Sequence, residues 1–191
     1  MHFTHLLPTA ALLALASARN QEIAVGKNGL TFEPSNIVAS PGDTLTFKFY
    51  PRSHSVVQSN FENPCQPIEN GFNSNFIAVP DGVSDTVFVL QVNDTRPIWI
   101  YCSQAKHCQA GMVAVVNQAP GPNSLEAYAA AAKNVPAAGV PTVVQGGVLE
   151  AAAAAPTPGA TPGVSNAAAA AETAAYGFAG VAALAAGLWG F

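Results

Sequence analysis

One stretch near the middle of the chain carries three side chains that can bind a metal ion. Cys102, His107 and Met112 are spaced Cys-x4-His-x4-Met. The runs on either side of this stretch, 97–102 and 112–117, are strand-like, so the three residues are expected on the loop that joins two strands. One loop would then present a thiol, an imidazole and a thioether together.

A fourth donor comes from a distant part of the sequence. His54 follows Pro51, where one strand-like run has ended and another begins. A thiolate, two imidazoles and a thioether are the ligands of a blue-copper centre, with three strong in-plane donors and one weak axial sulfur. Zinc is the competing metal, but its structural sites more often use several Cys and its catalytic sites usually keep a water.

The strand before the loop is predicted to point the sulfur of Cys102 into the core. Ile98, Ile100 and Cys102 have the same parity, so they lie on one face of a strand. Trp99 and Tyr101 have the opposite parity and are expected to pack on the second face. A buried thiol is normally protonated, and a bound metal ion would hold it as the thiolate.

Residues 21–117 predict an all-β domain, because strand-like runs alternate with turns and no stretch carries a helical apolar stripe. In the clearest strand, 44–50, the side chains of Leu45, Phe47 and Phe49 share one face. About seven short strands in about 100 residues favour a β-sandwich. A long ordered loop is expected over 59–84, fixed by Cys65. The other expected strands are 22–25, 36–39, 54–58, 86–92, 97–102 and 112–117.

The composition changes after Pro120, where Ala, Pro, Gly and Val dominate. We expect a domain over 19–118 and a disordered low-complexity spacer over 119–165. Residues 124–133 could form a short helix within that spacer. Charged residues make up only 9% of the chain and the net charge is −4, which argues against a basic surface for nucleic acid.

The first residues have the pattern of a signal peptide. An apolar run, 6–16, ends at Ala16-Ser17-Ala18, which predicts cleavage after Ala18 and removal of residues 1–18. A membrane anchor is the alternative, although the run is shorter than the roughly 20 residues of a membrane span. With the signal peptide removed, three Cys remain in an oxidising compartment, and an odd count leaves one thiol unpaired.

The last residues have the layout of a GPI-attachment signal. Small residues, a spacer and the apolar run 176–191 follow one another, which predicts attachment at Asn166 or Ser165 and removal of the rest of 166–191. A short single-pass helix is the alternative. The protein is therefore expected outside the cell, on the plasma membrane or in the cell wall, with Asn93 in an Asn-Asp-Thr sequon as a glycosylation site.

Taken together, the Cys-x4-His-Cys arrangement with a following Met resembles the cupredoxins, and among them the plant phytocyanins and their fungal secreted, GPI-anchored, serine-rich-type relatives. The resemblance covers about 21–117. It implies a Greek-key sandwich, one mononuclear type 1 copper site and one-electron transfer. It also implies a disulfide between Cys65 and Cys108, with two free thiols as the alternative. The copper ligands that it implies are His54, Cys102, His107 and Met112.

The leading interpretation is a monomeric, non-enzymatic copper protein at the cell surface, with an unknown redox partner. A copper-free wall or adhesion protein that retains the fold is the alternative, and the intact ligand set argues against it. Multicopper oxidases need more His than the chain has, and a copper monooxygenase needs a His at the mature N-terminus. A Cys-His hydrolase lacks a residue to orient His107 beside Cys102.

Overall fold

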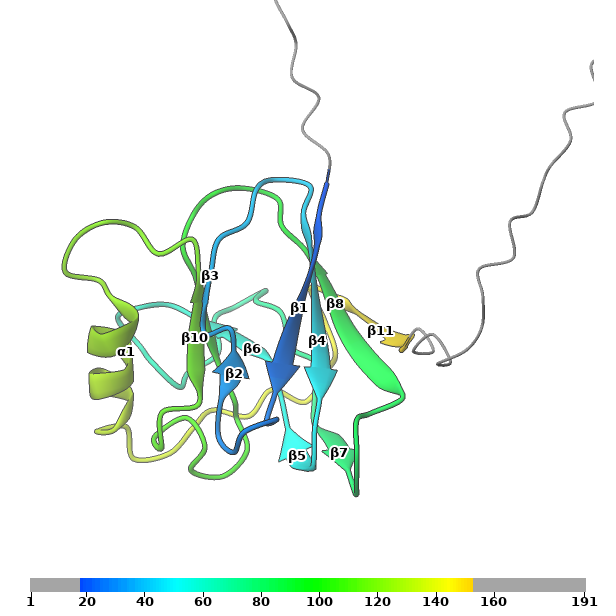
Figure 1. Ribbon diagram of the computed structural model, residues 1–191. Coiled ribbons are helices and arrows are strands. Elements are labelled where there is room, and N and C mark those ends of the chain that lie inside the picture. The colour runs from blue at the N-terminus through cyan, green and yellow to red at the C-terminus, as the bar shows by residue number, and fades with distance from the viewer. Residues whose placement is uncertain (1–17, 153–191) are drawn as a thin grey trace, which may run out of the picture. The chain divides into compact units, whose positions relative to one another are not determined.

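The computed structural model describes residues 18–152, which form two β-sheets packed face to face (Figure 1). The first sheet has the order β11-β8-β4-β1-β2, the second has the order β3-β10-β9-β6, and β5 and β7 form a separate pair. No helix in this part of the chain is long and apolar enough to cross a membrane. The strands are β1 (Asn20–Val25), β2 (Phe32–Glu33), β3 (Asn36–Ile37), β4 (Thr44–Phe49), β5 (Arg52–His54), β6 (Val57–Ser59), β7 (Ile77–Val79), β8 (Thr86–Gln91), β9 (Ile98–Tyr101), β10 (Val113–Val116) and β11 (Val148–Ala151).

The expected all-β sandwich is confirmed, and its main core lies between the two sheets. The chain passes from one sheet to the other between β2 and β3, β3 and β4, and β8 and β9, as a Greek-key sandwich requires. At the centre of the first sheet, β4 pairs parallel with β1 and antiparallel with β8. The side chains of β4 alternate between the two faces as predicted. Leu45, Phe47 and Phe49 are fully buried, whereas Lys48 lies on the outer face and pairs with Glu22.

The second sheet is buried on both faces. Ile100 and Cys102 point into the main core, whereas Trp99 and Tyr101 point into a second core on the other side. The predicted parity of this strand is therefore confirmed. All four residues of β10 are buried as well, so this sheet needs a cover on its outer face.

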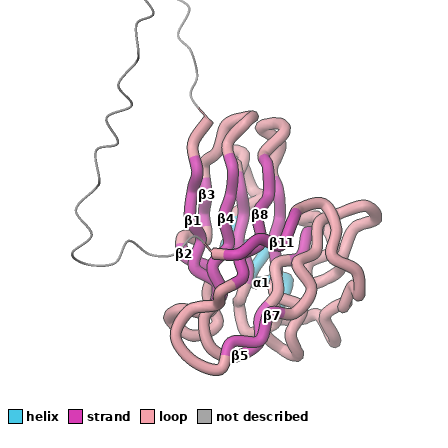
Figure 2. The backbone as a smooth tube through the Cα atoms, turned by 90° about the vertical axis from the view of Figure 1, so that its right-hand side faces the viewer, coloured by secondary structure: helices cyan, strands magenta, loops and turns pink. Residues whose placement is uncertain are grey.

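Residues 119–152 supply that cover, and we call them the strap. The prediction that the spacer begins at residue 119 differs from the structure, in which the strap is folded. Its helix α1 (Leu125–Ala132), within the predicted 124–133, is capped by Ser124 and places Tyr128 in the second core. The chain then returns to the first sheet, where β11 pairs with β8 (Figure 2). Residues 153–165 of the expected spacer lie outside the described residues.

The strap contains few large side chains, but a small number of specific contacts hold it against the β-sandwich. Tyr128 stacks near Trp99 with ring centroids 4.9 Å apart, and its hydroxyl bonds the hydroxyl of Ser59. Further along, the side chain of Asn73 donates to the carbonyl of Val143, and the backbone of Gln145 pairs with that of Asn73. The strap is therefore bound by specific hydrogen bonds as well as by apolar packing.

Two predictions of local structure need correction, one of a strand and one of a loop. The run 54–58 is not one strand, because β5 ends at His54 and β6 starts at Val57. Between them the backbone amides bind side chains and not a neighbouring strand: the amide of Val56 donates to Ser74 Oγ. The expected loop 59–84 is ordered but contains β7, which pairs with β5.

We expect Tyr128→Ala to lower the free energy of unfolding by about 3–5 kcal/mol, because it leaves a cavity in the second core. Urea unfolding of the purified protein measures this loss. Glu126→Gln, at an exposed position of the same helix, is the control and should cost less than about 1 kcal/mol. An equal, small effect of both changes would mean that the strap does not belong to the folded domain.

Candidate metal centre

Three of the predicted ligand residues meet at one end of the sandwich, and we call His54, Cys102 and His107 the metal centre. Their donor atoms all lie within 4.8 Å of one another. Cys102 Sγ is 4.0 Å from His54 Nδ1 and 3.5 Å from His107 Nδ1. Within residues 18–152, no other group of three His, Cys, Asp or Glu side chains comes together in this way.

Cys102 directly follows β9, and its thiol is held by donors from two segments. The amide of Ser55 donates to Cys102 Sγ at 3.4 Å. The hydroxyl of Ser55 is fixed in turn, since it accepts the amide of Ser103 at 2.8 Å. Burial raises the pKa of the Cys102 thiol, and hydrogen bonds from the amides of Gln104 and Ser55 partly oppose that rise. The two amides thus favour a thiolate at a position where burial disfavours one.

The imidazole ring of His54 packs against Gly26, which directly follows β1. Gly26 lies so close that a Cβ at this position would stand 2.2 Å from His54 Nε2. Burial, and then the neighbouring His107, lower the pKa of His54, while a hydrogen bond with the carbonyl of Pro51 opposes the shift. The imidazole is therefore neutral at neutral pH, which leaves a nitrogen lone pair free for a metal ion.

His107 sits on a tight loop and reaches the surface, since it is half-buried whereas His54 is only 2% exposed. Its amide donates to the carbonyl of Gln104, and its carbonyl accepts the amide of Met112. Burial lowers the pKa of His107 also. Next to it, Cys108 forms the disulfide with Cys65 that the family resemblance implied.

Met112 closes the loop that carries the ligands. Its carbonyl accepts the amide of Cys102 at 3.1 Å, and its side chain is fully buried in the same core cluster as the Cys102 thiol. The backbone thus brings Met112 next to the metal centre. The role of its thioether as a metal ligand stays a prediction.

The separations of the two imidazole nitrogens from Cys102 Sγ suit a shared metal ion. Metal–sulfur and metal–imidazole bonds of about 2.3 and 2.0 Å, at tetrahedral to trigonal angles, place sulfur and nitrogen about 3.5–3.7 Å apart. The two observed separations from Cys102 Sγ, 3.5 and 4.0 Å, are close to this value. The donor set, one thiol and two neutral imidazoles, suits copper or zinc and not a hard cation.

Sequence reasoning assigned no role to Gly26 and Ser55, which contact the metal-binding residues without being metal ligands themselves. A glycine before Lys27-Asn28-Gly29 reads as part of a turn, and nothing in the sequence shows that an imidazole packs on it. Of the other predicted sites, Asn93 is exposed in the turn between β8 and β9, and its glycosylation stays a prediction. Ser165 and Asn166 lie outside the described residues.

No family model matches the chain. The chain is 38% identical over 151 residues to an extracellular serine-rich protein of Arthroderma benhamiae, a match covering 75% of this chain but only 57% of the relative's length. It is 36% identical over 163 residues to the probable GPI-anchored cupredoxin-1 of the same organism, covering 85% of this chain and 84% of that one.

Solved structures resemble the fold more distantly. A reduced auracyanin from Roseiflexus castenholzii is 18% identical, with a TM-score of 0.39, and the match covers 55% of this chain and 99% of that one. A purple cupredoxin from Nitrosopumilus maritimus is also 18% identical, with a TM-score of 0.40 and coverage of 50% and 95%.

We expect Gly26→Ala to displace the His54 ring and destabilise the domain. Gly29→Ala is the matched control, because both glycines have positive φ, 84° and 87°, but nothing lies within 4 Å of a Cβ at Gly29. The control should lose about 1–2 kcal/mol through backbone strain, and Gly26→Ala about 1–3 kcal/mol more through overlap. Urea unfolding and the imidazole NMR signals of His54 measure the two effects. Equal losses with unchanged His54 signals would contradict the packing described here.

Proposed function

Because this chain belongs to the cupredoxin family, we propose that its metal centre holds one copper ion and transfers single electrons. The proposed ligands are His54, Cys102, His107 and, as the weak axial donor, Met112. One observation carries the proposal: a buried thiol that accepts an amide hydrogen bond lies 3.5 and 4.0 Å from two imidazole nitrogens. Copper in such a set of thiolate and imidazole ligands supplies one-electron chemistry.

The protein's own contribution is to keep the ligands in place. His54 is fixed by Gly26, and Cys102 by the amide of Ser55. When a metal ion binds, the thiol must lose its proton, and hydrogen bonds from the amides of Ser55 and Gln104 stabilise the resulting charge. Ligands that are already positioned need little movement when the charge at the site changes, which favours fast electron transfer.

Electrons would enter and leave by way of His107. Its half-buried imidazole is the part of the metal centre nearest to solvent, whereas Cys102 and His54 are buried. On the other side of Cys102, Tyr101 is fully buried and its hydroxyl donates to the carbonyl of Gly139 in the strap, so a partner could not contact this residue directly. A redox partner would therefore bind over His107.

Cys102→Ser should abolish the intense visible absorption of the copper-loaded protein, because that band needs electron density from a thiolate. Met112→Gln should keep the colour and lower the reduction potential, since an axial ligand mainly tunes the potential and an amide oxygen favours Cu(II). Absorption and EPR spectra, with voltammetry, measure both changes. Unchanged colour and copper affinity in Cys102→Ser would exclude this site and favour a copper-free wall or adhesion protein.

The proposed location is the outer face of the cell, with a GPI lipid as the only membrane attachment. This proposal is supported by the two relatives, one named extracellular and the other GPI-anchored, and by the sequence pattern at Ser165 and Asn166.

Phospholipase C treatment of intact expressing cells should release the protein, because it cleaves the lipid from the anchor. A chain that ends at Ala175, and so lacks the apolar run, should appear in the medium without treatment. Immunoblots of cells and medium measure both. A surface protein that resists the enzyme and retains Phe191 would support a membrane-spanning helix in place of the lipid.

A further inference from the structure

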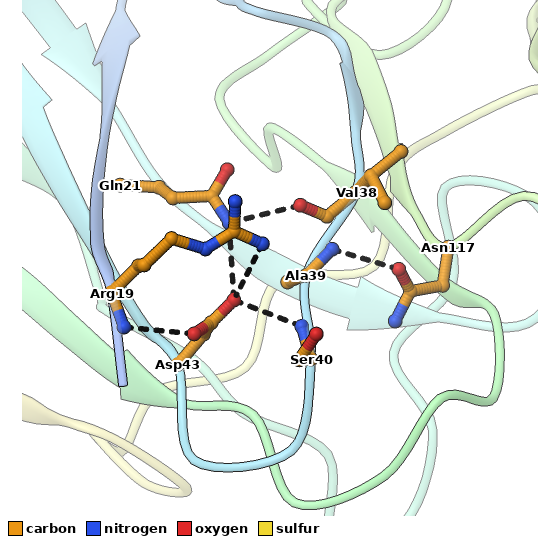
Figure 3. A network of polar contacts seen from close by, with 7 residues as sticks. All are labelled: Arg19, Gln21, Val38, Ala39, Ser40, Asp43 and Asn117. Atoms are coloured by element: carbon orange, nitrogen blue, oxygen red, sulfur yellow. Dashed lines mark hydrogen bonds and ion pairs between the residues drawn. The ribbon is translucent and has the colours of Figure 1, made fainter. Parts of the chain in front are cut away.

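The buried carboxylate of Asp43 accepts a hydrogen bond from the backbone at the start of the folded chain. It lies at the far end of the sandwich from the metal centre. The backbone nitrogen of Arg19 donates to Asp43 Oδ1 at 2.8 Å (Figure 3). Asp43 is only 1% exposed, although it lies in the turn before β4. Gly26, at the other end of β1, packs on His54, so the length of β1 separates the two sites.

The other oxygen of Asp43 is also occupied, by donors that fix the direction of the carboxylate. The amide of Ser40 donates to Oδ2 at 2.9 Å, the side-chain amide of Gln21 lies 3.5 Å away, and the guanidinium of Arg19 lies 3.6 Å away. Within residues 18–152, no other charged side chain forms an ion pair with Asp43. Oδ1 is thus aimed at the Arg19 nitrogen.

The charge on this nitrogen depends on the peptide bond between Ala18 and Arg19. While the bond is intact, the nitrogen is a neutral amide with one hydrogen to donate. Hydrolysis by a signal peptidase adds water across the bond, leaves a carboxylate on Ala18 and releases an amine on Arg19 that takes up a proton. The product carries a full positive charge within hydrogen-bond distance of a buried negative one.

We propose that Asp43 is the binding site for the α-ammonium group of the mature N-terminus, so that cleavage after Ala18 stabilises the folded domain. The neighbouring hydrogen bond from the Thr44 amide to the Arg19 carbonyl, 2.8 Å long, holds Arg19 in register with β4. A cut one residue earlier or later would put the new charge at a different position. The buried carboxylate would therefore stabilise this mature terminus more than termini cut one residue away.

The proposal has a definite pH dependence. The α-ammonium group has an ordinary pKa of about 7.7–8.0, and pairing with Asp43 raises it in the folded state. Its contribution to stability is therefore complete below about pH 7.7 and disappears as the pH rises through the raised value. Hydrogen bonds from the amides of Ser40 and Arg19 hold the pKa of Asp43 below its usual value, so the carboxylate stays charged over this range.

The test compares a chain that begins at Arg19 with one that begins at Ala18, both ending at Phe191 and with equal metal content. The two proteins have the same net charge and differ in where the α-ammonium lies. We expect the Arg19 chain to unfold about 2–5 °C higher near pH 7, and the gap to close toward about pH 10. The gap should vanish when both chains carry Asp43→Asn and should remain in Arg19→Gln, which lacks the guanidinium.

Equal melting temperatures, or a gap that persists in Asp43→Asn, would overturn the proposal. If Asp43→Asn does not fold, NMR titration of the α-amino group in the unaltered Arg19 chain decides the question. A pKa at or below the ordinary value of about 7.7–8.0 would overturn it, and a raised pKa would support it. Mass spectrometry of the protein secreted from the full chain should find Arg19 as the first residue, and a different first residue would also overturn the proposal.

Discussion

The burial of one sulfur atom between two sheets is the constraint on which the metal end of this protein depends. Cys102 is fully buried, so any negative charge on its sulfur must be stabilised by donors that the fold supplies. The amide of Ser55 is such a donor, and it is available because the chain between β5 and β6 leaves the sheet. The break in the expected strand 54–58 thus leaves the Ser55 amide free to donate to the sulfur of Cys102.

The ligand loop is held from outside as well as from within. The disulfide joins Cys108 on this loop to Cys65, closing a loop over a separation of 43 residues, which stabilises the fold by about 4 kcal/mol on the chain-entropy account. The strap covers this bond: the amide of Gly139 donates to the carbonyl of Cys65, and Gln109 on the ligand loop donates to the carbonyl of Val135. Covalent and hydrogen-bonded supports therefore meet beside the metal centre.

Local patterns predicted the parts of this structure that depend on local sequence. The parity of Ile100 and Cys102 and the buried face of β4 follow from residue types and spacing. The grouping of His54 with the ligand loop follows from the donor types and from the resemblance to the cupredoxins, because His54 is far from that loop in sequence. The fold of the strap could not be predicted in this way. It depends on one buried aromatic residue, Tyr128, in a low-complexity sequence, and on hydrogen bonds to residues such as Asn73 that are far away in sequence. The packing of Gly26 on His54 is equally non-local.

The position of β11 decides how the domain responds to mechanical force applied at its C-terminal end. β11 is an exposed edge strand, and within residues 18–152 it pairs with β8 alone. The hydrogen bond from the Ala152 amide to the Asp85 carbonyl is the first that such a force would break. Pulled away from the sheet, β11 would unzip one residue pair at a time, which needs little force at each step. The next resistance is the paired backbone of Gln145 and Asn73. A protein tethered through this end would thus yield first at a strand that holds no ligand, and the strap would act as a mechanical buffer for the metal centre.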